Sequence, residues 1–345
     1  MAHTTSASDT VEHTAAPAAR ETGPPPVPPP GPFVRALRVV AVAGCLPYLA
    51  LKVAWIAGSR VGVPDGSVLL EHRGLMAGAN SATVLMDASV IVLALLLTRP
   101  WGGRAPAWLL LLPLWAATGL LTPIMAGYPL QLLVGLSGGG APADGSSSEP
   151  FLDEWVFGVV YTGFIVQGLA LGALFVRYAR NRWGRLWQGT VGQLPPSALA
   201  AAQRPLAVAA AVVALFPIAV HLLWASGSTT GLTPGLADGS GADSRVLDVM
   251  WVLLLAVTAA AGPVLAFRGW RRLPLAVPLM LGWLGSGSVA CWGAWLSITS
   301  LAGMSDLAER PTPLMNLTYA GQMIAGLLVL TLGAHHCAER AAATR

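Results

Sequence analysis

Three ionisable side chains, Lys52, Asp87 and His221, stand inside long apolar stretches of the sequence. A charge inside a membrane costs several kcal/mol unless it is paired or hydrated, so each of these residues is a candidate functional residue. If the stretches are helical, Lys52 lies about 9 Å from the end of its stretch, at about 1.5 Å per residue. Asp87 lies at a similar depth in the next stretch, which predicts an ion pair between Lys52 and Asp87.

A functional hypothesis places these residues in one polar site that opens to the outer face of the membrane. Lys52 and His221 would face each other there. Lys52 would bind an anionic group, and His221 would bind the same group or relay protons. Trp55 and Trp224, each one helical turn nearer the surface, would stack against the ligand.

A structural hypothesis explains the same residues without a ligand. Lys52 would extend its ammonium group toward the lipid headgroups, and Asp87 would anchor a local hydrogen-bond network. Trp55 and Trp224 would belong to the aromatic belt at the membrane interface. The sequence leaves both hypotheses open.

Other residue types offer no recognisable catalytic or cofactor-binding set. The run His335-His336-Cys337 contains metal-ligand types, but neighbouring residues on a helix diverge by about 100° and cannot all face one ion. The sequence contains no G-x-x-x-x-G-K-[S/T], G-x-S-x-G or H-E-x-x-H motif. We therefore expect no metal, no cofactor and no enzymatic activity.

The composition is that of a membrane protein. Apolar residues make up 54% of the 345 residues and charged residues only 10%, against about 25% charged in soluble domains. Mean hydropathy is +0.63. This composition excludes a soluble enzyme, a nucleic-acid-binding protein and a disordered scaffold. The odd number of cysteines (Cys45, Cys291 and Cys337) argues against a disulfide framework.

Eight apolar runs are long enough to cross a bilayer as helices, because a hydrocarbon layer of ~30 Å takes about 20 residues. The third and seventh runs contain prolines and glycines, which neighbouring helices can accommodate. We therefore predict an all-α, polytopic membrane protein with eight transmembrane helices. The predicted spans are 36–58, 78–98, 107–127, 155–178, 205–226, 247–267, 274–300 and 316–337.

The arginines predict the orientation, because cytoplasmic loops carry an excess of basic residues. With the N-terminus inside, fifteen arginines fall on the cytoplasmic face and four on the outer face, whereas four acidic residues fall inside and eleven outside. The net charges are then +11 inside and −7 outside. We predict a multi-pass protein of the cell membrane with both termini cytoplasmic.

The segments outside the membrane regions are short. Residues 1–32 are polar and rich in proline, which predicts a disordered cytoplasmic tail with no cleavable signal peptide. The outer loop 136–149 is rich in glycine and serine and is predicted to be flexible. A basic cytoplasmic linker, 181–204, joins the two membrane regions 36–180 and 205–340.

The two membrane regions share patterns that predict a duplicated four-helix unit. Residues 52–62 and 221–231 both read [K/H]-x-x-W-x-x-G-S-x-x-G, at an offset of 169 residues. Residues 161–169 and 319–327 share Y-x-G-x-x-[V/I]-x-G-L, at an offset of 158 residues. Because four helices per unit is an even number, both units would have the same orientation, as in the parallel repeats of some transporters.

The duplication has two explanations. It could place a binding site between the two units, or it could simply build a stable eight-helix bundle. At the offset of 169 residues Lys52 corresponds to His221, but Asp87 corresponds to Ala256. We therefore expect the second unit to lack an acid beside His221.

The segment 221–228, His-Leu-Leu-Trp-Ala-Ser-Gly-Ser, resembles small bacterial four-helix integral membrane proteins. Those proteins carry H-x-x-W-A-x-G-G at the outer end of their first helix. This chain has Ser228 in place of the second glycine, and Lys52 replaces the histidine in the first unit. The resemblance implies a four-helix unit, here in tandem duplicate, and implies no particular activity.

Two functions are compatible with these observations. The first is a non-enzymatic integral membrane protein that interacts with membrane lipids and other envelope proteins. The alternative is a small carrier or permease with an outward-facing polar site around Lys52, Asp87 and His221, which would take a small anionic ligand. The basic, tryptophan-containing stretch 177–187 either binds anionic lipid headgroups or simply sets the topology. No nucleic-acid partner is expected.

Overall fold

The computed structural model describes residues 31–65, 73–138, 152–194, 197–302 and 310–343. Within these residues all regular structure is helical, apart from one isolated bridge between Thr190 and Pro274. The predicted disordered tail 1–32 and the predicted flexible loop 136–149 lie largely outside the described residues.

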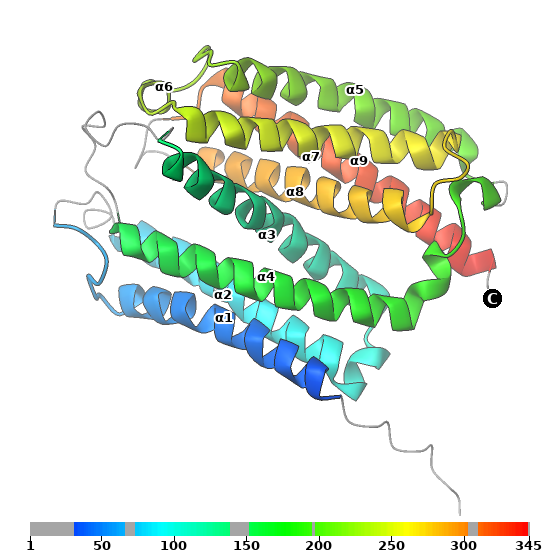
Figure 1. The fold of residues 1–345 in the computed structure, drawn as a ribbon, viewed down its shortest axis with the longest axis horizontal. Helices are drawn as coiled ribbons and strands as arrows, with labels where there is room; N and C mark the ends of the chain where they lie inside the picture. The colour runs from blue at the N-terminus through cyan, green and yellow to red at the C-terminus, as the bar shows by residue number, and fades with distance from the viewer. Residues whose placement is uncertain (1–30, 66–72, 139–151, 195–196, 303–309, 344–345) are drawn as a thin grey trace, which may run out of the picture.

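Eight long helices run side by side in the described part of the chain, and consecutive helices point in opposite directions (Figure 1). Each forms over one of the predicted apolar runs, because such a run can satisfy its backbone polar groups only internally. Most extend a few residues beyond the predicted limits. The long helices are α1 (Pro32–Ile56), α2 (Arg73–Thr98), α3 (Ala107–Leu136), α4 (Glu154–Trp183), α5 (Ala200–Ala225), α7 (Ala242–Phe267), α8 (Ala276–Leu301) and α9 (Pro313–Ala343).

Seven of these helices, all except α8, contain a stretch apolar enough to cross a membrane, judged over the described residues. The chain is therefore an all-α, multi-pass membrane protein, as the composition predicts. The helix α8 is less apolar because its 26 residues include three tryptophans, four glycines and four serines. Residues 285–290 of α8 are all buried, so other helices rather than lipid surround this part of it.

The helices form two groups that meet at α3. In the first group α1 packs against α2 and α4. In the second group α5 packs against α7 and α9, and α8 packs against α7 and α9. The helix α3 packs against α4 of its own group and against α8 and α7 of the other. Figure 1 shows α3 lying between the two groups.

The crossing of α3 and α8 is a contact between backbones. A Cβ atom added to Gly119 would lie 2.3 Å from the carbonyl carbon of Gly287, so glycine allows the approach. The indole of Trp115 donates to Ser286 Oγ at 3.0 Å beside this contact. Two further indoles of α8 donate across the same interface, Trp283 to Thr118 Oγ1 at 2.9 Å and Trp292 to the carbonyl of Leu120 at 3.1 Å.

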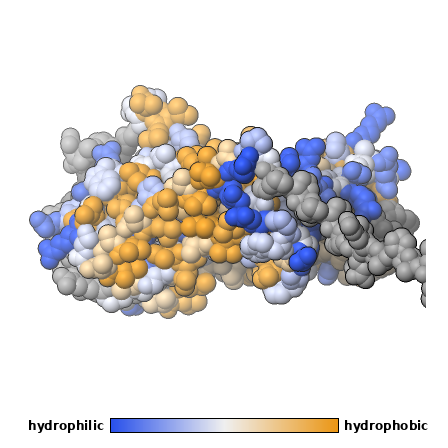
Figure 2. Space-filling model, turned by 90° about the horizontal axis from the view of Figure 1, so that it is seen from below, coloured by the Kyte–Doolittle hydropathy of each residue, from blue (hydrophilic) through white to orange (hydrophobic). Residues whose placement is uncertain are grey.

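The outer surface is apolar between two hydrophilic ends. Figure 2 shows a broad apolar area on one face, flanked by hydrophilic residues. Because consecutive helices reverse direction, the helix ends that carry arginine lie together at one end of the bundle, the arginine-rich end. This end includes Arg35, Arg99, Arg177, Arg268 and Arg340.

The basic linker is a folded element. It contains two short 3-10 helices, η3 (Gly184–Trp187) and η4 (Val191–Gln193). Val191 N–H donates to the carbonyl of Leu273 at 2.9 Å, and Leu275 N–H donates to the carbonyl of Gly189 at 3.0 Å. Val191 and Leu275 are both fully buried. The linker therefore packs on the turn between α7 and α8. A second short helix, α6 (Pro234–Asp238), precedes α7.

Candidate functional site

The first candidate site is a buried polar cluster between α1, α2 and α4, and it contains Lys52. On α1 the positions of Tyr48, Lys52 and Trp55 follow the spacing of one helix face. The Lys52 ammonium lies 4.9 Å from the centre of the Tyr48 ring and 5.0 Å from that of Trp55. Its Nζ also donates to Oδ1 of Asn80 at 2.7 Å. Cation–π contacts and one hydrogen bond thus replace part of the hydration that the ammonium loses.

The neighbouring helices contribute one carboxylate and two amides to this cluster. Asn80 and Asp87 share a face of α2, and Gln167 comes from α4; all three are 5% exposed or less. Asp87 interacts electrostatically with Lys52 and hydrogen-bonds the side chain of Gln167. Among the described ion pairs none joins Lys52 to Asp87 within 4 Å. The predicted Lys52–Asp87 pair is therefore a longer-range interaction with Asn80 as the direct partner of Lys52.

The Lys52 cluster (Lys52, Asn80, Asp87 and Gln167) has unused hydrogen-bonding capacity. Three of its atoms are buried without a partner: the donor Asn80 Nδ2 and the acceptors Asp87 Oδ2 and Gln167 Oε1. Leaving a buried polar atom unpaired costs about 1–3 kcal/mol, and native proteins rarely tolerate it. The cluster can therefore bind a molecule that supplies both an acceptor and donors.

A second buried polar cluster, the His221 cluster, lies between α5, α7 and α9. Nδ1 of His221 lies 2.8 Å from Asp248 Oδ1, and Nε2 lies 2.8 Å from Gln322 Nε2. The expectation that the second unit lacks an acid beside His221 is wrong. It compared Ala256 with Asp87 by sequence position, whereas the acid comes from two turns earlier on α7.

Hydrogen bonding defines the protonation state of this imidazole. The Gln322 amide nitrogen can only donate, so His221 Nε2 accepts and the ring proton is on Nδ1, which donates to Asp248. A half-turn of the Gln322 amide would present its oxygen to a protonated Nε2. Both protonation states of His221 can thus keep two hydrogen bonds.

Aromatic rings enclose His221. The Trp224 ring meets the imidazole edge-on at 5.2 Å, and the Trp251 ring stacks on it at 6.1 Å. Trp292 in turn contacts Trp251 at 6.2 Å. His221 is only 6% exposed, so this cluster is closed by packed side chains.

The two tryptophans of the repeated motif close the turns that follow their helices. The Trp55 indole donates to the carbonyl of Val61 at 2.8 Å, and the Trp224 indole donates to the carbonyl of Thr230 at 3.0 Å. Trp224 is 7% exposed and lies inside the bundle rather than in an interfacial belt. Both indole N–H groups are therefore committed to the protein backbone.

The structure does not bring Lys52 and His221 together. The partners of Lys52 are on α1, α2 and α4, whereas those of His221 are on α5, α7 and α9. Because α3 and α8 pack between these two groups of helices, the polar residues form two separate clusters. The expected single site, in which Lys52 and His221 face each other, is not formed.

Sequence reasoning missed four members of the clusters: Asn80, Gln167, Asp248 and Gln322. A signal was present for two of them, since Gln167 and Gln322 are the glutamines that fall within the predicted spans. Asp248 was counted with the outer-face acids because it stands at the edge of a predicted span. No group of three or more His, Cys, Asp or Glu side chains placed to hold a metal ion occurs among the described residues.

No protein-family model, curated protein or solved structure matches the chain. The chemistry of the two clusters therefore carries the functional argument. The Lys52 cluster has unpaired polar atoms, whereas both ring nitrogens of His221 have partners.

Proposed function

We propose that this chain is a non-enzymatic carrier that binds a small anionic solute at the Lys52 cluster. It has eight transmembrane spans arranged as two tandem four-helix units, with both termini in the cytoplasm of a cell with this protein in its cell membrane. The His221 cluster has a structural role in the second unit. The observation that carries the proposal is the set of three unpaired polar atoms around Lys52.

The unpaired atoms specify the chemistry of the solute. An anionic group would accept hydrogen bonds from the Lys52 ammonium and from Asn80 Nδ2. A hydroxyl or amino group on the same molecule would donate to Asp87 Oδ2 and Gln167 Oε1. A small hydroxy acid or amino acid has both features, and its binding would leave no polar atom of the cluster unpaired.

The length and position of α8 support its assignment as the eighth span. Its 26 residues exceed the ~20 that a hydrocarbon layer requires. It contains no charged residue. With eight spans, the two ends of the chain share the arginine-rich end of the bundle, in agreement with the excess of basic residues expected on the cytoplasmic side.

The turns after α1 and α5 support the duplication. Gly58 and Gly62 have φ angles of 91° and 71°, and Gly227 and Gly231, 169 residues later, have φ angles of 95° and 75°. These are left-handed conformations that favour glycine. The turns therefore share one backbone conformation as well as one sequence pattern. They are also the part of the chain that resembles the bacterial four-helix proteins with an H-x-x-W-A-x-G-G motif.

Both turns dock on the last helix of their unit in the same way. A Cβ atom added to Gly62 would lie 2.3 Å from Cγ2 of Val156, and one added to Gly231 would lie 2.3 Å from Cδ2 of Leu314. Val156 and Leu314 are separated by 158 residues, the offset of the second shared motif. The two units thus agree in a contact between distant parts of their sequences.

Replacing Lys52 by methionine is expected to abolish solute binding, because it removes the positive charge and keeps the length of the side chain. Loss of a charge-assisted hydrogen bond of about 1.5–3 kcal/mol corresponds to roughly 10- to 100-fold weaker binding. Native mass spectrometry of the protein in mild detergent measures the bound solute directly. His221→Gln is the matched control, since it changes the corresponding position of the other unit. A wild-type protein without a bound small molecule, or equal occupancy in the Lys52→Met variant, would contradict the proposal.

Cysteine labelling tests the eight-span topology. In a background without Cys45, Cys291 and Cys337, a membrane-impermeant maleimide should label Asp238→Cys and Ser305→Cys in intact cells. It should label Arg185→Cys and Ala342→Cys only after permeabilisation. These four positions are chosen on opposite sides of the proposed spans. Protection of Ser305→Cys in intact cells would show that α8 does not cross the membrane.

A further inference from the structure

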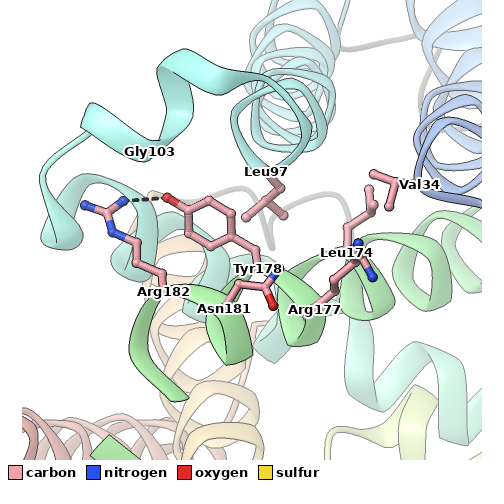
Figure 3. A pocket seen from close by; sticks show the side chains of 8 residues that line it. All are labelled: Val34, Leu97, Gly103, Leu174, Arg177, Tyr178, Asn181 and Arg182. Atoms are coloured by element: carbon pink, nitrogen blue, oxygen red, sulfur yellow. Dashed lines mark hydrogen bonds between the residues drawn. The ribbon is translucent and has the colours of Figure 1, made fainter. Parts of the chain in front are cut away.

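A cavity of about 260 Å³ opens at the arginine-rich end of the first unit (Figure 3). It lies between the start of α1, the end of α2, the last turns of α4 and the 3-10 helix η2 (Pro100–Arg104). Its apolar wall is formed by Val34, Leu97 and Leu174, which are 8% exposed or less. Its polar wall comes from α4 and contains two arginines, a tyrosine and an asparagine.

One of these arginines holds the cavity in shape. Arg182 donates through Nη2 to the carbonyl of Ala105 at 2.7 Å and through Nη1 to Tyr178. The Tyr178 hydroxyl in turn donates to the carbonyl of Gly102 at 3.0 Å. These bonds tie η2 to α4, so the walls of the cavity are fixed before any ligand arrives.

Other hydrogen-bond donors at the cavity are free. Figure 3 shows Arg177 and Arg182 on opposite sides of Tyr178. Neither Arg177 nor Asn181 has a hydrogen-bond or ion-pair partner in the part of the chain that the structure describes. Arg38, one helical turn beyond Val34 on α1, has a buried Nη1 without a partner.

The elements around the cavity supply no counter-ion. The sequence contains no Asp or Glu in 22–64, 88–143 or 155–237, the segments that include α1, the second half of α2, η2 and nearly all of α4. An unpaired guanidinium at a partly apolar cavity is most stable with an external anion.

We propose that this cavity binds a phosphate ester. The Arg177 guanidinium would contact the phosphate oxygens, with Asn181 as a second donor, and the apolar wall would receive the carbon skeleton of the ester. Arginine suits phosphate because its planar group offers two parallel N–H bonds. Phospholipid headgroups and soluble phosphate compounds share this chemistry, and basic pockets between membrane helices bind anionic headgroups in other proteins. The site is distinct from the Lys52 cluster and does not depend on the carrier proposal.

The test compares two variants that each remove one positive charge from α4. Arg177→Gln removes a donor of the cavity. Arg180→Gln is the matched control, because Arg180 is exposed, does not line the cavity and has no partner in the described structure. Native mass spectrometry in mild detergent would titrate each protein with short-chain phosphatidylglycerol, with phosphatidylcholine of the same chain length, and with inorganic phosphate as competitor.

The expected result is that Arg177→Gln weakens phosphatidylglycerol binding about tenfold while Arg180→Gln leaves it unchanged. Phosphatidylcholine, which is zwitterionic, should bind more weakly. If inorganic phosphate fails to compete, the ligand is a lipid headgroup, and if it competes at millimolar concentration, the site takes soluble phosphate. Equal losses in the two variants would overturn the proposal in favour of diffuse charge attraction, and so would equal binding of the two lipids.

Discussion

Replacing Asp248 by alanine is expected to destabilise the protein by about 3 kcal/mol. The carboxylate accepts a hydrogen bond from His221 Nδ1 at 2.8 Å, and the side chains of His221 and Asp248 are 7% and 17% exposed. Without the carboxylate, the imidazole N–H stays buried among Trp224 and Trp251 with no acceptor. The midpoint of thermal unfolding in mild detergent should fall by several degrees.

Two further variants show whether the lost hydrogen bond is the cause. Asp248→Asn keeps an oxygen acceptor for Nδ1 and should recover most of the lost stability. Asp243→Ala removes an acid from the same helix, but the Asp243 Oδ1 atom is buried without a partner, so this change should not lower the unfolding midpoint. Equal effects of Asp248→Ala and Asp243→Ala would show that the His221 cluster does not stabilise the second unit.

Replacing Gly119 by leucine is expected to disrupt the junction between the two groups of helices. A Cβ atom at Gly119 would lie 2.3 Å from the carbonyl carbon of Gly287 and 2.4 Å from its oxygen. The obstacle is backbone, which cannot rotate away as a flexible side chain can. We therefore expect a loss of about 3 kcal/mol, the upper end of the usual cost of overpacking.

The consequences should extend along α3 and α8. Separation of these helices would break the hydrogen bond from Trp115 to Ser286 and the one from Trp283 to Thr118. Size-exclusion chromatography and thermal unfolding in detergent measure the effect. The control is Gly135→Leu on the same helix, where an added Cβ atom meets nothing within 4 Å. Wild-type stability in the Gly119→Leu variant would mean that the α3–α8 contact does not hold the two groups together.

The carrier proposal and the structural role of the His221 cluster separate in these experiments. Asp248→Ala should lower stability, but at a temperature where the variant is folded it should leave the solute at the Lys52 cluster. Lys52→Met should release the solute and leave the His221 cluster intact, because no described contact joins the two clusters. A single site shared by both clusters would instead lose its solute in both variants.

The sequence by itself determined the helices and the residues that a membrane makes costly. Long apolar runs form helices because the backbone must satisfy its polar groups within each segment, which is a local requirement. The same locality makes Lys52, Asp87 and His221 recognisable, since each interrupts an apolar run. It also makes the turn after α1 and the turn after α5 recognisable, since their glycines and tryptophans stand at fixed short spacing.

Only the tertiary structure decided which polar groups meet. Gln322 reaches His221 across 101 residues, and Trp115 reaches Ser286 across 171 residues. Such pairs depend on which helix faces pack together, and packing is set by the shapes of all the facing side chains at once. This is why Asp248 rather than position 256 supplies the acid beside His221. It is also why Lys52 and His221, which correspond in the sequence, lie in separate clusters on opposite sides of α3 and α8.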